Sequence, residues 1–335
     1  MKMKKFINAP ENLTQELLEG LAAAYPQKVK LDEGKIVVRA KPKSEDKVAI
    51  ITLGGAGHEP ALSGFVGEGM LDASVVGDIF AAPNAVSLLA GLRKFKREAG
   101  ILLVVLNHAG DVMSANMAMK MAQREGIKLK SILVADDISA GLDTPLADRR
   151  GLAGCIPLFK VAGAAAEEGK SLDEVFEIAE KFNSRIATLA VAMTGCTHPQ
   201  NGQPITELAD DEMEIGMGQH GEGGGGRSKI LTADETAKIM FGDLAKAVSL
   251  KSGEKIFVAV NGVGATTPME LSIVFRAVKN LASEMGVEVV GGLVDELLTV
   301  QEMAGFQLIV CVVDEQSRKY LYAKSNAPYW TSLGE

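Results

Sequence analysis

The sequence predicts an α/β protein of two domains, each built on a mainly parallel sheet that is flanked by helices. Short apolar runs alternate with amphipathic stretches along the 335 residues, which is typical of strand–helix–strand units. The chain is longer than a single hydrophobic core usually supports, and 47% of its residues are hydrophobic, so two cores can be filled. The low aromatic content of 5% also suits closely packed α/β layers.

Strands are expected at short apolar runs, and helices where apolar residues recur at helical spacing. The predicted strands are Lys47–Thr52, Ile101–Leu106, Ser131–Ala135, Ala187–Met193, Lys255–Asn261, Val287–Gly291 and Leu308–Val313. The predicted helices are Leu13–Tyr25, Asn84–Glu98, Met113–Glu125, Ile156–Glu168, Leu172–Asn183, Thr232–Ser249, Pro268–Met285 and Val294–Met303. Ser171 and Thr267 precede two of these helices, where a hydroxyl caps free backbone amides, and Pro268 suits the first helical position.

The domain boundary is expected near residues 183–187, where a helical pattern ends and a new strand begins. This division gives an N-terminal domain of residues 1–185 and a C-terminal domain of residues 186–335. Because no proline-rich or low-complexity linker separates them, the two halves are expected to pack closely.

Composition excludes several classes of protein. A net charge of −8, without a basic stripe, argues against nucleic acid as a partner. The basic start of the chain runs into polar residues, so no signal peptide is predicted, and no run of about 18 apolar residues predicts a membrane span. Three cysteines without metal-ligand spacing favour a reducing compartment. We therefore predict a cytoplasmic protein.

A glycine-rich loop, residues 54–60, follows the first long predicted strand and reads Gly-Gly-Ala-Gly-His-Glu-Pro. A dinucleotide-binding loop would need a glycine where Pro60 stands, so the spacing does not fit. The glycines either form a backbone nest for oxygen atoms of a ligand or a tight turn, and both interpretations stay open. The following segment, residues 64–83, is too rich in glycine for a helix and too apolar for a solvated loop. It is expected to be ordered by the rest of the fold or by a ligand.

The loop Asn107–Asp111 follows the predicted strand Ile101–Leu106, and ligands of parallel sheets bind beyond such strand ends. Asp111 is interpreted either as a helix N-cap or as a catalytic carboxylate. His108 is expected to be an ordinary surface histidine. His198 lies in a predicted turn and receives no role.

Two acidic clusters, Asp136-Asp137 and residues 210–212, raise the question of a metal ion. Neighbouring residues of a strand point to opposite faces, so Asp136 and Asp137 cannot both face one ion. Both clusters are therefore expected to be solvated loop charges, and no metal site is predicted.

A second glycine-rich loop, Met217–Gly226, carries His220. The chain has only four histidines, and two of them, His58 and His220, lie beside glycines that allow close approach of a ligand. The two histidines are expected to form the two sides of one small-molecule site.

Five motifs in chain order together resemble the substrate-binding subunit of dihydroxyacetone kinases, the DhaK family. They are Gly-Gly-x-Gly-His-Glu-Pro at 54–60, Gly-Phe-Val-Gly-x-Gly-Met-Leu at 64–71, Gly-Asp-Ile-Phe-x-x-Pro at 77–83, Asn-x-x-Gly-Asp at 107–111 and the segment 211–222 around His220. The segment 261–271 is also typical of the family, and the likeness runs over nearly the whole chain. The resemblance implies a two-domain α/β subunit that forms a homodimer and binds a short ketose.

The resemblance also implies roles for particular residues. The family's histidine at the position of His220 attacks the ketone carbon and holds the substrate as a hemiaminal. The positions of His58 and Asp111 act as acid and base on the substrate hydroxyls. The substrate-binding residues implied are Gly55, Ala56, Gly57, His58, Leu106, Asp111 and His220.

No nucleotide-binding loop of a known kind occurs in the sequence, so no cofactor is expected on this chain. The resemblance implies that a separate DhaL-type subunit holds ADP or ATP with Mg²⁺. The phosphoryl donor is then either free ATP or a phosphotransferase-system protein, and the sequence leaves both open.

The chain departs from the family pattern beside the substrate. Leu106 stands where the family commonly has a lysine, His108 and Ala109 are also changed, and Ala56 replaces a common serine. A lost charged donor removes a hydrogen bond of about 1.5–3 kcal/mol, so a related ketose such as erythrulose is an alternative substrate. A non-catalytic, ketose-sensing regulatory paralogue is a second alternative, although His58, Asp111 and His220 are retained. A nicotinamide-dependent oxidoreductase has only the first glycine loop in its favour.

Overall fold

A computed structural model of the chain describes residues 4–334, which form two compact units. We name each unit after a candidate residue. The Asp111 unit consists of residues 5–134, 155–181 and 315–334, and the His220 unit is built mainly from residues 135–154 and 182–314. Each unit contains one six-stranded sheet. Within residues 4–334, no helix has the length and apolar character needed to cross a membrane.

These units differ from the two continuous halves, 1–185 and 186–335, that the sequence predicted. Hydrogen bonds explain the difference. After the last strand of the first sheet the chain joins the other unit, where Thr188 donates its backbone N–H to Asp136 and accepts one from Ile138. The end of the chain returns to the Asp111 unit, where the backbone N–H of Asn326 donates to Glu68 and that of Tyr329 donates to Gly64.

The sheet of the Asp111 unit has the strand order β1-β2-β4-β3-β5-β6. The strands β4, β3, β5 and β6 pair parallel with one another, whereas β2 pairs antiparallel with both β1 and β4. The strands are β1 (Val29–Asp32), β2 (Ile36–Arg39), β3 (Ala49–Ala56), β4 (Ala73–Ile79), β5 (Ile101–Leu106) and β6 (Leu129–Val134), with the short pair β13 (Ser325–Ala327) and β14 (Trp330–Ser332) apart from them.

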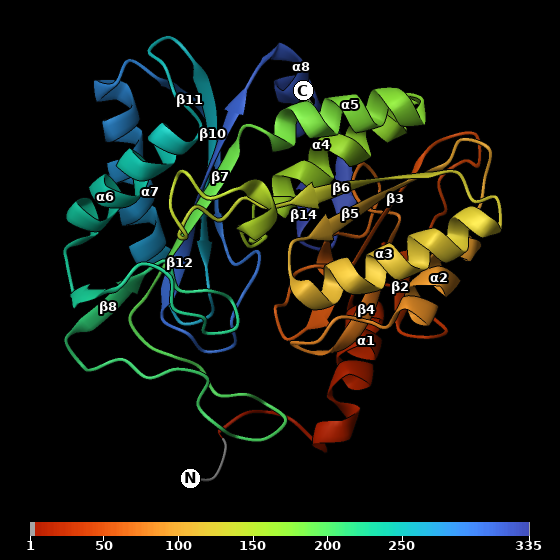
Figure 1. Cartoon of the computed structure of the whole chain (residues 1–335), viewed down its shortest axis with the longest axis horizontal. Coiled ribbons are helices and arrows are strands. Elements are labelled where there is room, and N and C mark those ends of the chain that lie inside the picture. The colour runs from red at the N-terminus through yellow and green to blue at the C-terminus, as the bar shows by residue number, and fades with distance from the viewer. Residues whose placement is uncertain (1–3, 335) are drawn as a thin grey trace. The chain divides into compact units, whose positions relative to one another are not determined.

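Helices cover this sheet, and α2 and α3 lie side by side over it (Figure 1). Their apolar faces pack on alternate residues of β3, β4 and β5, which form one buried cluster. The helices of the unit are α1 (Leu13–Ala24), α2 (Ala85–Lys94), α3 (Ala109–Arg124), α4 (Cys155–Glu168), most of α5 (Leu172–Asn183) and α8 (Glu315–Tyr322). The predicted cap at Ser171 is confirmed, because its hydroxyl accepts the backbone N–H of Glu174.

The glycine-rich segment 64–83 is ordered by the fold, as predicted. It holds the strand β4, and Phe65 and Met70 are fully buried. Glycine is required at Gly69, which has φ +72°, and at Gly67, where a Cβ would lie 2.6 Å from Ala327 Cα. The apolar character of the segment therefore reflects burial in the protein.

The sheet of the His220 unit has the order β11-β10-β12-β7-β8-β9. The strands are β7 (Ile186–Ala192), β8 (Glu212–Ile215), β9 (Arg227–Lys229), β10 (Lys255–Gly262), β11 (Glu288–Asp295) and β12 (Gly305–Val313). The helices α6 (Ala233–Ala247) and α7 (Pro268–Glu284) lie side by side and pack on it (Figure 1). Thr267 and Glu270 form a capping box at the start of α7, which confirms the cap predicted at Thr267.

The predicted α/β class with two helix-flanked sheets is confirmed, but the strand directions of this second sheet differ from the prediction. Only β10 and β11 pair parallel, and the other four pairs are antiparallel. The predicted helix Val294–Met303 is also wrong, because β11 continues to Asp295 and a non-helical loop follows. A parallel neighbour needs a long crossover connection, whereas this short loop returns β12 antiparallel to β10.

Candidate functional site

The first group of predicted site residues lies beyond the carboxyl ends of the parallel strands in the Asp111 unit's sheet. Strands β3 and β5 are parallel neighbours with Thr52 opposite Val104, so their carboxyl ends reach the same edge. His58 follows the end of β3, and the loop with Asp111 follows the end of β5. Brought together by strand pairing, these two loops occupy the position where parallel sheets bind ligands.

His58 is buried, with 6% of its surface exposed. Its ring packs on Phe80, with 4.8 Å between ring centroids and 42° between the ring planes. The next residue, Glu59, accepts the backbone N–H of Gly57 at 2.9 and 3.1 Å, and burial raises the pKa of the Glu59 carboxyl. Ring packing on one side and a carboxylate hydrogen bond on the other hold the His58 loop in shape.

The glycines of this loop are explained by contacts within the protein. A Cβ on Gly55 would lie 2.7 Å from the backbone nitrogen of Ala81. Gly57 has φ +103°, and a Cβ there would lie 2.8 Å from the Phe80 ring. Gly55 lies within β3 itself and Gly57 just after its end, so these two glycines allow the close approach of the segment that follows β4.

Asp111 lies in the first turn of α3 and is 8% exposed. The helix begins at Ala109, earlier than predicted, so His108 takes the N-cap position and the N-cap interpretation of Asp111 is wrong. A carboxylate in a first helical turn is stabilised by the helix dipole. A Cβ on Gly110 would lie 3.2 Å from the Ala82 side chain, so the start of α3 adjoins the same segment that packs on the His58 loop.

Leu106 ends strand β5 and is 4% exposed. Its place at the carboxyl end of β5 agrees with the expectation that residue 106 lies beside the loop of Asp111. His108, which lies between Leu106 and Asp111, is half-buried.

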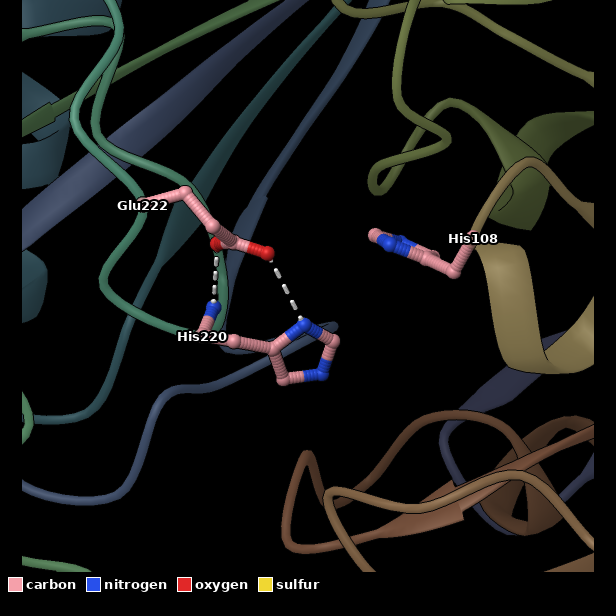
Figure 2. A group of neighbouring side chains, drawn as sticks. All are labelled: His108, His220 and Glu222. Atoms are coloured by element: carbon pink, nitrogen blue, oxygen red, sulfur yellow. Dashed lines mark hydrogen bonds and ion pairs between the residues drawn. The ribbon is translucent and has the colours of Figure 1, made fainter.

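His220 lies in the His220 unit, in the loop that joins β8 to β9. The loop turns tightly, because the backbone N–H of Gly218 donates to the carbonyl of Glu222 at 2.7 Å and Gly221 has φ +78°. Figure 2 shows the side chain of Glu222 folded back on His220. The Glu222 carboxylate accepts the backbone N–H of His220 at 2.9 Å, and His220 Nδ1 lies 3.2 Å from Glu222 Oε1.

The charge of Glu222 determines which nitrogen of His220 carries the proton. Burial alone would raise the pKa of the Glu222 carboxyl, but hydrogen bonds from the side chain of His220 and from backbone N–H groups lower it to about 2. A carboxylate can only accept, so in the neutral imidazole the hydrogen lies on Nδ1 and Nε2 keeps its lone pair. The His220 side chain is 28% exposed, so a small molecule can reach it.

The expectation that Asp136 and Asp137 are solvated charges is wrong, because they are only 3% and 1% exposed. Asp136 accepts the backbone N–H groups of Leu152 and Gly154, and burial raises the pKa of its carboxyl. Asp137 accepts a hydrogen bond from Arg150 Nε at 2.7 Å. The two side chains thus have separate partners, in line with the expectation that they cannot share one ion.

The other acidic cluster, residues 210–212, is exposed or half-buried, as predicted, and Asp211 pairs with Lys229. His198 lies in a turn, also as predicted, where its carbonyl accepts the N–H of Gly202.

The sequence reasoning assigned no role to Glu222 or to Arg150. Glu222 lies two residues from the candidate histidine, and a carboxylate at that spacing in a glycine turn is a signal that could have been used. Arg150 lies far from His220 in the sequence, and no local pattern indicates that the two are neighbours.

Comparison with known proteins identifies the family. The sequence profile of the Dak1 domain matches residues 19–329, which is most of the chain. The chain belongs to the Dak1 family. The resemblance to dihydroxyacetone kinase subunits, predicted from the five motifs, is thereby confirmed.

Relatives of this Dak1 chain include both kinase components and a regulator. It is 39% identical to the "PTS-dependent dihydroxyacetone kinase 1, dihydroxyacetone-binding subunit DhaK" of Listeria innocua, over 94% of this chain and 95% of that protein. It is 38% identical to the L-erythrulose kinase of Pectobacterium atrosepticum, over 97% of this chain and 56% of that protein. It also superimposes on the structure of the "Dihydroxyacetone kinase operon co-activator Dha-DhaQ" with a TM-score of 0.89 and 34% identity, covering 95% of this chain and 98% of that one.

Proposed function

We propose that this Dak1 chain is the ketose-binding subunit of a dihydroxyacetone-type kinase. In this proposal it holds a short ketose on His220 and presents a terminal hydroxyl to a phosphoryl donor. Near-complete coverage of a relative named as a dihydroxyacetone-binding subunit supports the proposal. The observation that carries it is the pairing of His220 Nδ1 with the ionised Glu222, which leaves Nε2 as a nucleophile.

The covalent step follows from this pairing. The Nε2 lone pair forms a bond to the ketone carbon, the carbonyl π bond breaks, and the oxygen takes up a proton to become a hydroxyl. The positive charge that develops on the imidazole is stabilised by the ionised Glu222 carboxylate, and release of the Nδ1 proton to water balances the proton that the oxygen takes up. The product is a hemiaminal that retains every atom of the ketose. Polyols such as glycerol have no carbonyl carbon to attack, so this step selects ketoses.

His58 and Asp111 are proposed as the acid and base that act on the substrate hydroxyls. Asp111 is suited to accept the proton of the terminal hydroxyl as it is phosphorylated, because the helix dipole favours its ionised form. Phosphoryl transfer has a loose transition state, so holding the ketose in place should contribute more to the rate than this proton transfer. Gly55, Ala56, Gly57 and Leu106 are proposed to line the substrate in the same unit.

The nucleotide and its Mg²⁺ are assigned in this proposal to a separate DhaL-type subunit, and the naming of the Listeria relative as one subunit of a kinase supports this division. No cofactor is proposed for this chain. Association of two copies as a homodimer stays a prediction from the resemblance, and a cytoplasmic location stays a prediction from the composition.

The identity of the ketose depends on Leu106. An uncharged side chain at this position gives no charged donor to the substrate, which leaves room for a four-carbon ketose. The 38% identity to a protein named L-erythrulose kinase supports erythrulose as the alternative to dihydroxyacetone.

A ketose-sensing regulator is the second candidate function. It is favoured by the structural similarity to the operon co-activator, which extends over 95% of this chain. A sensor would need the adduct on His220 but no proton transfer to Asp111, so the two candidates differ in what Asp111 contributes.

Two measurements test the proposal. Native mass spectrometry with dihydroxyacetone and with the erythruloses should show a mass increase equal to the whole sugar, because hemiaminal formation expels no water. The increase should be absent in His220→Ala. An unchanged adduct in that variant would contradict the covalent role of His220.

Phosphorylation of the same ketoses, with the nucleotide subunit added, then separates the two functions. Turnover that is lost in Asp111→Asn while the adduct persists supports the kinase. An adduct without turnover on any ketose supports the sensor.

A further inference from the structure

The loop that carries His220 is anchored at its start by Met217, which is buried in an apolar cluster, but the rest of it has little apolar packing. Residues 222–230 are exposed, and four of the five residues from Glu222 to Gly226 are glycines. Glycine has the largest conformational entropy in an unrestrained chain, so such a loop needs polar cross-links to keep one shape. Glu214 supplies one, because it accepts the backbone N–H of Gly224 at 3.1 Å, and Arg150 supplies several.

Arg150 donates to backbone carbonyls on both sides of His220 in this loop. Its Nη2 donates to the carbonyl of Gly216 at 2.7 Å, and its Nη1 donates to the carbonyl of Glu222 at 3.2 Å. The same Nη1 lies 3.9 Å from the carboxylate oxygen Glu222 Oε2, the oxygen that accepts the His220 N–H. The guanidinium therefore spans the turn in which His220 lies.

The other side of the guanidinium is anchored in the protein interior. Arg150 Nε donates to Asp137 Oδ2 at 2.7 Å, and Nη2 donates to the hydroxyl of Ser139 at 2.7 Å. Asp137 is 1% exposed, and its second oxygen accepts the N–H of Ser139 at 2.9 Å. A buried, hydrogen-bonded carboxylate holds the arginine in one orientation, and a planar guanidinium with five donors transmits that orientation to several acceptors.

We propose that Arg150, fixed by Asp137, is the positioning residue that holds the Glu222–His220 pair in the geometry for ketone addition. This inference rests on the proposed covalent function of His220 and adds a residue on which that function depends. Arg150 is not proposed to touch the ketose. It acts by fixing the carbonyl of Glu222, and with it the carboxylate that orients the imidazole.

The test uses two substitutions of Arg150 and one matched control. Arg150→Lys keeps a positive charge beside buried Asp137, but a single ammonium cannot bridge the acceptors that the guanidinium reaches. Arg150→Ala leaves a space that added guanidinium ion can fill. The control is Arg149→Lys, because Arg149 donates to the carbonyls of Thr144 and Leu142 within its own segment.

Ketose affinity is read from the adduct titration by native mass spectrometry, and the thermal midpoint is recorded for each variant. We expect Arg150→Lys to bind ketose on the order of 10- to 100-fold more weakly, because an error of about 1 Å in a reacting group costs about that much. Guanidinium chloride at millimolar concentration should restore adduct formation in Arg150→Ala but leave Arg149→Lys unaffected. Such rescue is not expected if Arg150 only stabilises the fold.

The outcomes separate this inference from the proposed function. If the wild-type chain forms no adduct with any ketose, the proposed function fails first. If the wild type forms the adduct and Arg150→Lys forms it with equal affinity, the positioning role of Arg150 is overturned while the proposed function stands. If Arg150→Ala does not fold, the ketose affinity of Arg150→Lys alone decides whether Arg150 has a positioning role.

Discussion

Substitution of Gly218 by alanine tests the geometry of the candidate nucleophile directly. A Cβ on residue 218 would overlap both the Glu222 carboxylate and the guanidinium of Arg150. Non-bonded heavy atoms prefer a separation of roughly 3.5 Å, so the carboxylate has to retreat by at least about 1 Å. Both neighbours are ends of flexible side chains, and Gly218 does not have a positive φ, so the fold should persist.

We expect Gly218→Ala to lower ketose affinity on the order of 100-fold, since a displacement of about 1 Å costs that much in a positioned reaction. The assay is the adduct titration by native mass spectrometry, with circular dichroism to establish that the fold is intact. The matched control is Gly223→Ala in the same loop, where the nearest atom to a new Cβ is Glu214 Oε1 at 3.0 Å. Equal ketose affinity of Gly218→Ala and Gly223→Ala would refute the role given to the Glu222 carboxylate.

Three further predictions concern single side chains. Glu222→Gln should abolish most of the His220 adduct at pH 7, because a neutral amide can donate to Nδ1 and so favour the tautomer with a protonated Nε2. An adduct titration equal to that of the wild type would contradict this prediction. Burial lowers the pKa of Lys160 from 10.5 to about 8, so keeping its side chain charged in the folded state costs roughly 3 kcal/mol at pH 7. Between about pH 8 and 10.5 only the unfolded chain still holds this proton, so the stability of the wild type should rise with pH over that range. Lys160→Met loses the hydrogen bond to the Tyr320 carbonyl but should still be about 2 kcal/mol more stable at pH 7. Its free energy of unfolding, measured in urea, should not rise between about pH 8 and 10.5. A rise equal to that of the wild type would show that another group titrates. Leu106→Lys should shift the ratio of adduct affinities toward dihydroxyacetone over erythrulose by about tenfold or more, and an unchanged ratio would remove residue 106 from the determinants of selectivity.

The parts of the fold that the sequence predicted well are those in which local pattern and burial agree. Strand β5 is apolar throughout and fully buried, and its predicted bounds match the structure. Helix α7 begins where Thr267 and Pro268 indicated, because its capping box is local in the sequence. Both features depend on interactions between residues that are close in the chain.

The wrong helix at 294–303 shows where local pattern is insufficient. Leu297, Leu298 and Val300 are buried at spacings that a helix would also allow. The loop is instead held by the buried side chain of Asn261, which accepts the backbone N–H groups of Leu297 and Leu298 and donates to the carbonyl of Leu298. A polar residue on another strand thus satisfies the backbone that a helix would have satisfied internally.

The candidate site was predictable to a similar extent. His58, Asp111 and His220 stand in recognisable sequence motifs, and parallel pairing places the ends of β3 and β5, which His58 and Asp111 follow, on the same side of the sheet. The orientation of His220 was not predictable, because it depends on a turn that places Glu222 against the imidazole. Arg150 was hidden from sequence reasoning, since its link to that turn exists only after the segment 135–154 has joined β7.

The interleaving of the two units along the chain has a consequence for the order in which a ribosome-bound chain can fold. The segment 135–154 leaves the ribosome before any of the strands β7 to β12 with which it is to associate. The pair β13–β14 of the Asp111 unit, in turn, is synthesised only after the whole of 182–314. Domains usually complete their folding as units during synthesis, the N-terminal one first. Here the first unit to begin folding is the last to finish, and the contacts of Arg150 with the His220 loop can form only after that loop has been synthesised.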